Sequence, residues 1–218
     1  MDFSSLKIIQ WNSRGVMGKI EAKKLFIDYD IIVLTETFLN EGDSYTLKGF
    51  NAIRFDRVSN SRGGILFLVK SHIAYNKLDL NILYNFEQIE LAAITIDTNL
   101  GPIDIIAYYR SPVHQTGHSI NTWRHEWKLV IDKVQSLNQV IFLGDFNAHH
   151  PWWGSDKACP YGDAIINNID IEKIALLNDG SATHISLTKG EYKSSCIDLT
   201  FMSYSLLLNT KWQVLDDN

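Results

Sequence analysis

Three apolar runs in the sequence each lead into amide or carboxylate side chains, which are residue types that can bind or hydrolyse phosphate esters. The runs cover residues 8–9, 31–34 and 140–143. If the three strands lie side by side and point the same way, their ends share one rim of a sheet, where open sheets bind ligands. One polar residue at a strand end is usually only a turn former, so the argument depends on the whole set. The set consists of Asn12, Glu36, Asp145 and Asn147.

The chemistry that this set predicts is phosphodiester hydrolysis. A hard cation such as Mg²⁺ typically binds one or two carboxylates and fills its other positions with water and substrate phosphate. We therefore expect Glu36 to be a metal ligand, and Glu36 with Asp145 to form a Mg²⁺ or Mn²⁺ site. Asp145 could also orient or deprotonate a water, while the amides of Asn12 and Asn147 hold phosphate oxygens without adding negative charge.

The composition excludes several classes of protein. With 45% apolar and 21% charged residues among 218, the chain is neither disordered throughout nor collagen-like. No apolar run approaches the roughly 18 residues of a membrane span, and the first residues lack the pattern of a signal peptide. We expect a soluble, unsecreted protein with no membrane partner.

A formal net charge of −5 excludes binding to nucleic acid through a general basic field. Binding to DNA must then be local, and Arg14, Arg62 and Arg110 each lie close to a candidate segment. The two cysteines, Cys159 and Cys196, are too few for a disulfide framework, and we expect them to be inert thiols.

Strands outnumber helices in the hydrophobic pattern. Strands are expected over residues 6–11, 31–34, 64–69, 90–96, 103–109, 140–143 and 196–202. A helix with a buried apolar stripe is expected after Ser119, and shorter helices over residues 163–177 and 19–27. No linker divides the chain, so the fold class should be α/β or α+β: one domain over residues 1–218, with a mixed or largely antiparallel sheet and helices outside it.

Other kinds of site receive little support from the sequence. His149, His150, His184 and Cys159 include no Cys-x-x-Cys or His-x₃-His pair that would anchor zinc. Neither a serine-hydrolase elbow nor a nucleotide phosphate loop is present. We expect His149 and His150 to orient the loop around Asp145 or to face the substrate groove, where His150 would contact substrate.

The same segments resemble the endonuclease/exonuclease/phosphatase superfamily, which contains deoxyribonuclease I and the apurinic/apyrimidinic endonucleases. Six blocks follow the order of that family and span nearly the whole chain: Gln10-Trp11-Asn12-Ser13-Arg14-Gly15, Leu34-Thr35-Glu36-Thr37, Arg62-Gly63-Gly64, Tyr108-Tyr109-Arg110-Ser111-Pro112, Gly144-Asp145-Phe146-Asn147 and Ser195-Cys196-Ile197-Asp198. The extension Ala148-His149-His150-Pro151-Trp152-Trp153-Gly154 is most similar to the endonuclease domains of insect-type non-LTR retrotransposons.

The resemblance implies a four-layered sandwich, with helices outside two packed mixed sheets and a substrate groove across the strand ends. It also implies a role for each matching residue. Glu36 would be the metal ligand, and Asp145 would act on the nucleophilic water. The residues that would lie at the scissile phosphate are Asn12, Asn147 and Tyr109, with Tyr108 a weaker candidate than Tyr109.

By the same resemblance, Thr183 and Ser195 would contact phosphate through their hydroxyls, and Asp198 would orient a catalytic histidine. The family places that histidine in a Ser-Asp-His motif shortly after the Asp198 strand, and no such motif follows Asp198 here. We therefore expect either a fragment that stops before the motif or a degenerate copy. Losing a catalytic acid or base costs about 10²- to 10⁴-fold in rate.

The function that these observations favour is a metal-dependent endonuclease that nicks target DNA to create a primer for reverse transcription. The expected cofactor is Mg²⁺ or Mn²⁺, and the expected partners are DNA and a reverse transcriptase domain on the same polyprotein. The protein is expected to be monomeric, and to lie in the nucleus when it acts on chromosomal DNA and otherwise in the cytoplasm. Two alternatives remain: a nucleic-acid-binding module that no longer cleaves, and a phosphatase of the same fold.

Overall fold

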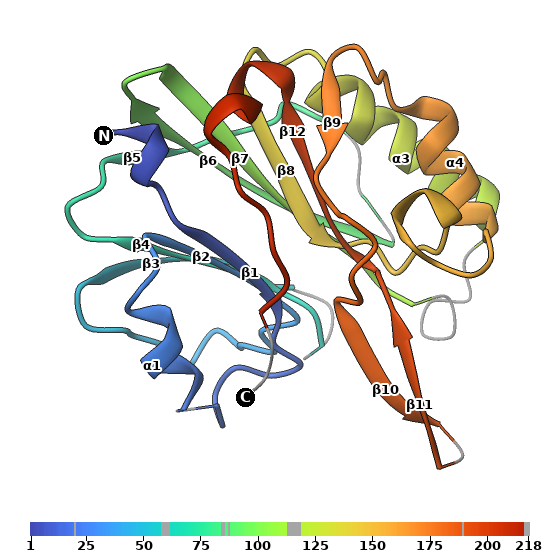
Figure 1. The fold of residues 1–218 in the computed structure, drawn as a ribbon. Helices are drawn as coiled ribbons and strands as arrows, with labels where there is room; N and C mark the ends of the chain where they lie inside the picture. The colour runs from blue at the N-terminus through green and yellow to red at the C-terminus, as the bar shows by residue number, and fades with distance from the viewer. Residues whose placement is uncertain are drawn as a thin grey trace.

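The computed structural model describes residues 1–19, 21–57, 62–83, 86, 88–112, 119–188 and 190–215. In this part of the chain two mixed β-sheets pack face to face, and helices cover their outer faces (Figure 1). The expected arrangement of layers is therefore present. None of the described helices is long and apolar enough to cross a bilayer.

The first sheet has the strand order β1-β2-β4-β3. β1 and β2 are parallel, while β4 is antiparallel to both β2 and β3. Every residue of β2 is buried, which explains its uninterrupted apolar sequence. The four strands are β1 (Ile8–Asn12), β2 (Ile31–Thr35), β3 (Phe50–Phe55) and β4 (Ile65–Lys70).

The second sheet has the strand order β5-β6-β7-β8-β12-β9. Only the β7–β8 pair is parallel. Because β8 and β12 pair directly, Asp145 lies opposite Asp198. The strands are β5 (Tyr75–Lys77), β6 (Ile89–Thr98), β7 (Gly101–Arg110), β8 (Val140–Asp145), β9 (Ile174–Leu176) and β12 (Asp198–Ser203).

Three layers of apolar side chains hold the sandwich together. One lies between the sheets, and two lie between a sheet and its helices. The predicted helix after Ser119 is α3 (Ile120–Val134), and the Ser119 hydroxyl caps it by accepting a hydrogen bond from the Thr122 N–H at 3.2 Å. Its fully buried Trp123 and Trp127 pack on the second sheet together with α4 (Pro160–Asn168). The short α1 (Ala22–Phe26) covers the first sheet.

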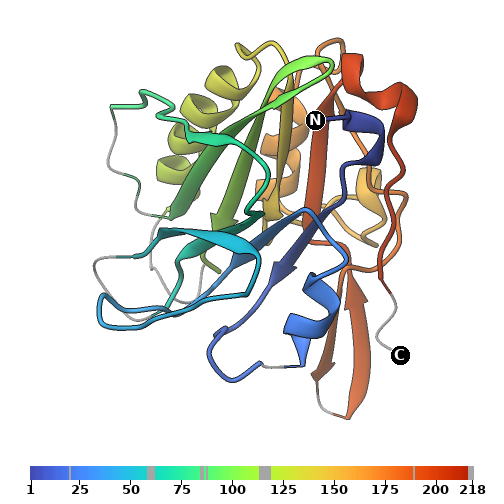
Figure 2. The ribbon, with the colours of Figure 1, turned by 90° about the vertical axis from the view of Figure 1, so that its left-hand side faces the viewer.

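Two further strands form a separate hairpin, β10 (His184–Thr188) and β11 (Glu191–Ser195). Figures 1 and 2 show it projecting beyond both sheets, close to the beginning of β12. Ile185, Leu187 and Tyr192 share one face of the ribbon and are 63–81% exposed. The sequence patterns considered above did not predict this hairpin.

Other expectations about the elements were wrong. The helix expected over residues 163–177 is α4 followed by strand β9, because the backbone becomes extended at Ile169 and the later apolar residues pair with β12. β3, β5 and β9 were missed. The expected shared rim of one sheet is instead formed by both sheets, since β8 is not a neighbour of β1 or β2. The described 3₁₀ helices are η1 (Phe3–Ser5), η2 (Pro151–Trp153) and η3 (Tyr204–Asn209).

Candidate active site

The Asn12 side chain joins the carboxylates of both sheets. Its amide nitrogen Nδ2 donates to Glu36 Oε1 at 2.9 Å and to Asp145 Oδ2 at 2.6 Å. Asn12 ends β1, Glu36 follows β2, and Asp145 ends β8. The sandwich therefore brings together the three polar ends that the sequence singled out, although they come from two sheets.

A second amide on β1 repeats this arrangement. Gln10 and Asn12 are two residues apart in a strand, so their side chains lie on the same face. Gln10 Nε2 donates to Asp198 Oδ1 at 2.8 Å. Because Asp198 lies opposite Asp145, two amides of β1 face two paired aspartates of the second sheet. No sequence motif singles out Gln10 for this role, although strand alternation places its side chain on the same face as that of Asn12.

The two aspartates carry strongly perturbed acidities. Burial raises the pKa of Asp145 well above its usual range, and the neighbouring Asp198 carboxylate raises it further. Burial also raises the pKa of Asp198, against hydrogen bonds from Gln10 and Thr183. A site that crowds buried like charges in this way favours a proton or a cation.

The backbone of the site residues is unusual. Glu36 and Asn147 have φ angles of 50° and 47°, in the left-handed region that few residues other than glycine adopt. The Glu36 carbonyl accepts a hydrogen bond from the Gly15 N–H at 2.7 Å. Beside Asp145, a Cβ on Gly144 would lie 1.8 Å from the Tyr108 carbonyl oxygen, so only glycine fits there. Left-handed residues of this kind cluster at functional sites.

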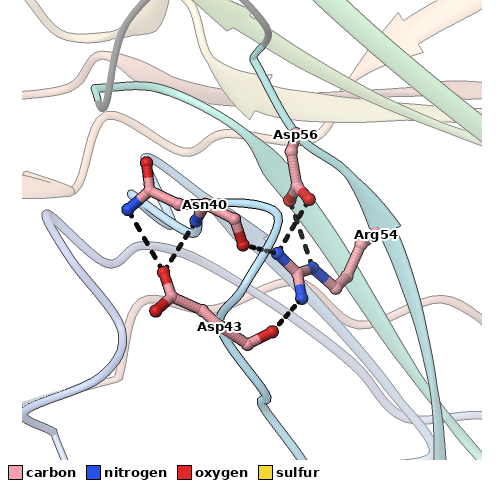
Figure 3. A network of polar contacts seen from close by, with 4 residues as sticks. All are labelled: Asn40, Asp43, Arg54 and Asp56. Carbon is pink, nitrogen blue, oxygen red and sulfur yellow. Dashed lines mark hydrogen bonds and ion pairs between the residues drawn. The ribbon is translucent and has the colours of Figure 1, made fainter.

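The segment that follows Glu36 is tied to β3 by a polar network (Figure 3). The guanidinium of Arg54 donates to the carbonyl oxygens of Asn40, at 2.6 Å, and of Asp43. It also forms an ion pair with Asp56 at 2.8 Å. The Asp43 carboxylate in turn accepts from the Asn40 N–H at 2.7 Å. These contacts connect the chain between β2 and β3 to β3 itself.

The two tyrosines of β7 have different environments. Tyr109 faces the space between the sheets, and burial followed by the charges of Glu36 and Asp145 raises the pKa of its hydroxyl. Tyr108 points to the other face of the sheet, where its hydroxyl accepts from Trp123 Nε1 at 3.2 Å. Tyr109 is therefore the tyrosine of the site, and Tyr108 belongs to the core.

Arg110 does not have the surroundings expected of a phosphate-binding residue. Its side chain is buried, its Nε donates to the Phe146 carbonyl oxygen at 2.9 Å, and Nη2 donates to that of Asn147. The guanidinium carbon lies 3.8 Å from the centre of the Tyr161 ring. Asn147 Nδ2 returns a hydrogen bond to the Arg110 carbonyl oxygen at 2.8 Å. Arg110 therefore holds the loop after β8, and the contact with substrate that was expected of it stays a prediction.

Replacing this arginine tests that assignment. Arg110→Met should destabilise the protein by about 2–4 kcal/mol, because it removes the donors to the buried Phe146 carbonyl and to the partly buried Asn147 carbonyl. Urea unfolding followed by circular dichroism measures the change. The exposed Arg124→Met on α3 is the matched control and should cost less than about 0.5 kcal/mol. Equal stability of the two variants would contradict a structural role for Arg110.

The remaining predicted residues are placed as follows. His150 caps η2, because its Nδ1 accepts from the Trp152 N–H at 3.1 Å. The Thr183 hydroxyl accepts from the Asp198 N–H at 3.0 Å and so anchors that strand. Ser195 lies opposite His184 at the base of the hairpin. The last two predicted residues are exposed arginines, Arg14 after β1 and Arg62 before β4.

Lys19 is a further cation near the site, and it was not among the residues predicted from the sequence. Its Nζ donates to the Ser13 carbonyl oxygen and lies 4.7 Å from the centre of the Trp11 ring. Burial and the charge of Arg14 lower the pKa of Lys19, whereas Glu36 raises it. No sequence motif marks this lysine, because its position depends on how the loop after β1 folds back on that strand.

Comparison with known proteins adds to this geometry. Residues 103–218 match the family described as "Endonuclease-reverse transcriptase". The chain is 30% identical over 191 residues to the RNA-directed DNA polymerase from mobile element jockey of Drosophila melanogaster, which covers 84% of this chain and 19% of that protein. It is 29% identical to the probable RNA-directed DNA polymerase from transposon X-element of the same species, covering 82% of this chain and 19% of that protein. The chain thus spans about a fifth of these relatives' length.

Among solved structures, the endonuclease domain of TRAS1, a telomere-specific non-LTR retrotransposon, aligns with a TM-score of 0.68 at 19% identity. The alignment covers 92% of this chain and 86% of that one. The catalytic domain of Xenopus laevis APE2 aligns with a TM-score of 0.66 at 18% identity, covering 92% and 83%. At such identities the likeness establishes a shared fold, and that fold is the predicted four-layered sandwich.

Proposed function

Because the chain belongs to the endonuclease–reverse transcriptase family and has the endonuclease/exonuclease/phosphatase fold that its motifs indicated, we propose that it is a metal-dependent DNA endonuclease. It would hydrolyse one phosphodiester bond of a target duplex, and the end released would prime reverse transcription. The relatives named as RNA-directed DNA polymerases support the proposal that a reverse transcriptase domain accompanies it on a longer polyprotein. Action on chromosomal DNA would place it in the nucleus.

The observation that carries the proposal is the amide of Asn12 between Glu36 and Asp145. Both carboxylate oxygens bond to one nitrogen atom, so they are no farther apart than two hydrogen bonds allow. A phosphate at this point would lie beside the Tyr109 hydroxyl, and it would take over one of the two N–H groups that Asn12 Nδ2 donates to Glu36 and Asp145. Asp145 is held by the Asn147 N–H at 2.9 Å in an orientation from which it could accept a proton from water.

The donor set fits Mg²⁺ or Mn²⁺. Among the described residues, no three His, Cys, Asp or Glu side chains gather to hold a metal by themselves. Mg²⁺ needs only one or two protein carboxylates and completes its shell with water and phosphate oxygens. Glu36 and Asp145 would hold the ion, which would supply positive charge to the phosphate undergoing hydrolysis.

Features around the carboxylates favour a duplex as substrate. Arg14 and Lys19 provide positive charge beside the site within an acidic protein, as phosphate binding requires. The β10–β11 hairpin projects from the same end of the sandwich and exposes Ile185, Leu187 and Tyr192. A two-stranded ribbon fits a DNA groove, and a small phosphate ester would not need one.

The proposal is tested by nicking of supercoiled plasmid. We expect nicking with Mg²⁺ and none with EDTA, slow for the 218-residue chain. A longer form that supplies a Ser-Asp-His segment should nick at least about tenfold faster, and Asp198→Ala should remove that gain. Plasmid binding without cleavage by either form would favour a binding module. Release of inorganic phosphate from small esters without nicking would favour a phosphatase.

A further inference from the structure

Arg14 and His184 form a contact that the proposed hydrolysis does not use. Arg14 Nη2 lies 3.2 Å from Nδ1 and 3.3 Å from Nε2 of the His184 ring. If Nη2 lay in the plane of the imidazole at these two distances, it would collide with the ring carbon between the two nitrogens. The guanidinium nitrogen therefore lies over the ring face, and the edges of the imidazole stay available to another partner.

Both residues are fixed beside the carboxylates. The Arg14 N–H donates to Asn12 Oδ1 at 3.2 Å, so its backbone is tied to the central amide. His184 begins the hairpin next to Thr183, whose N–H donates to the Ser195 carbonyl oxygen at 3.0 Å and whose hydroxyl bonds to the strand of Asp198. The pair therefore lies between the base of the hairpin and the Asn12 amide with its two carboxylate partners, Glu36 and Asp145.

The charges at this point are unbalanced. Arg14 forms no ion pair with an acidic side chain in the described part of the chain. The groups that act on His184 are Arg14 from the loop after β1, His149 from the loop after β8, and Glu36 at the end of β2. Burial, then Arg14 and His149, lower the pKa of His184, and Glu36 alone raises it. Burial and the two neighbouring groups thus disfavour the protonated imidazole in the free protein, beside a guanidinium that forms no ion pair within the described residues.

We propose that Arg14 and His184 form a binding subsite for a phosphate of the bound DNA strand, next to the one that is hydrolysed, and that His184 takes up a proton from solvent when the phosphate binds. The inference rests on the proposed function, because it names a second contact of the same substrate. An ionised phosphodiester brings the negative charge that the pair lacks, and a protonated imidazole can donate a hydrogen bond to its oxygens. No bond of the DNA is made or broken at this subsite.

Proton uptake makes the binding of DNA depend on pH. Fluorescence anisotropy of a labelled duplex measures this dependence. The titration is done without divalent metal, at constant ionic strength, between about pH 5.5 and about pH 8. We expect wild-type affinity to rise about threefold to tenfold towards acid pH. Protonation of the aspartates also contributes to the change in affinity with pH, and this contribution is the same in all variants. The test is therefore the difference in pH dependence between each variant and the wild type.

His184→Asn should remove most of the gain in affinity. The matched control is His72→Asn, an exposed histidine in the turn after β4, and it should keep the wild-type dependence. His149→Asn should also keep it. As a second measurement, the NMR titration of the His184 ring should shift to higher pH when the duplex is added to the wild-type protein.

The outcomes separate the two proposals. If wild type nicks DNA and His184→Asn keeps the full pH dependence, or if His149→Asn loses it, the subsite is wrong and the endonuclease stands. An unshifted His184 titration with bound duplex also overturns the subsite. If wild type neither binds nor nicks DNA, both proposals fail.

Discussion

Asp145→Asn is expected to lower the rate of DNA nicking by about 10²- to 10⁴-fold and, in the same molecule, to make the folded protein more stable. The rate falls because an amide cannot accept a proton from water. Stability rises by roughly 0.5–2 kcal/mol at neutral pH, because the buried charge beside Asp198 is removed. Nicking assays and thermal melts in metal-free buffer measure the two effects.

The raised pKa of Asp145 also predicts how the stability of the folded protein changes with pH. Asp145 has its pKa raised in the folded state, so its contribution to stability is complete below the unfolded pKa and is lost as pH rises through the folded one. The metal-free wild type should therefore lose stability from about pH 4 towards neutrality, and Asp145→Asn should lose less. Asp97→Asn, an exposed change on β6, should behave as wild type. Full nicking by Asp145→Asn, or a lower melting temperature, would refute the assignment.

Mg²⁺ is expected to raise the melting temperature by about 5–10 °C when its concentration is about 100 times the Kd. The ion relieves repulsion among the carboxylates that β2 of the first sheet and β8 and β12 of the second sheet bring together. Glu36→Gln removes one of the two proposed ligands and should abolish most of the shift, measured against NaCl of equal ionic strength.

The exposed Glu172→Gln is the matched control for charge, and it should retain the wild-type shift. An equal shift in Glu36→Gln would show that Mg²⁺ binds elsewhere. A shift that Mn²⁺ reproduces and NaCl does not would support a specific site for a divalent ion.

Much of the sandwich could be predicted because its central strands and its main helix carry strong local signals. β2 and β8 are buried on both faces and therefore uniformly apolar, and α3 repeats its tryptophans at helical spacing. Short edge strands such as β5 and β9 bury few residues, so their sequences show little pattern. The hairpin has alternating residues around Gly190, yet its apolar face lies in solvent, where a search for core residues does not find it.

The sequence predicted which residues gather at the candidate site better than it predicted what each of them does there. Asn12, Glu36 and Asp145 meet because each ends a strand, and a strand end can be located in a sequence. Arg110 and His150 lie beside the same blocks but serve as a loop anchor and a cap. Which way a side chain points from a loop depends on tertiary contacts, and no local pattern records these.

The hydrogen bond from Gln10 to Asp198 joins residues 188 positions apart in the chain. Contacts of such separation form late in folding, because the intervening chain must be ordered before they are gained. A nascent chain that has completed β1 and β2 has Asn12 and Glu36 but neither aspartate. Cleavage of DNA would therefore begin only after β12 has been synthesised and has packed into its sheet. The moment at which nicking begins during translation would then report when the two sheets come together.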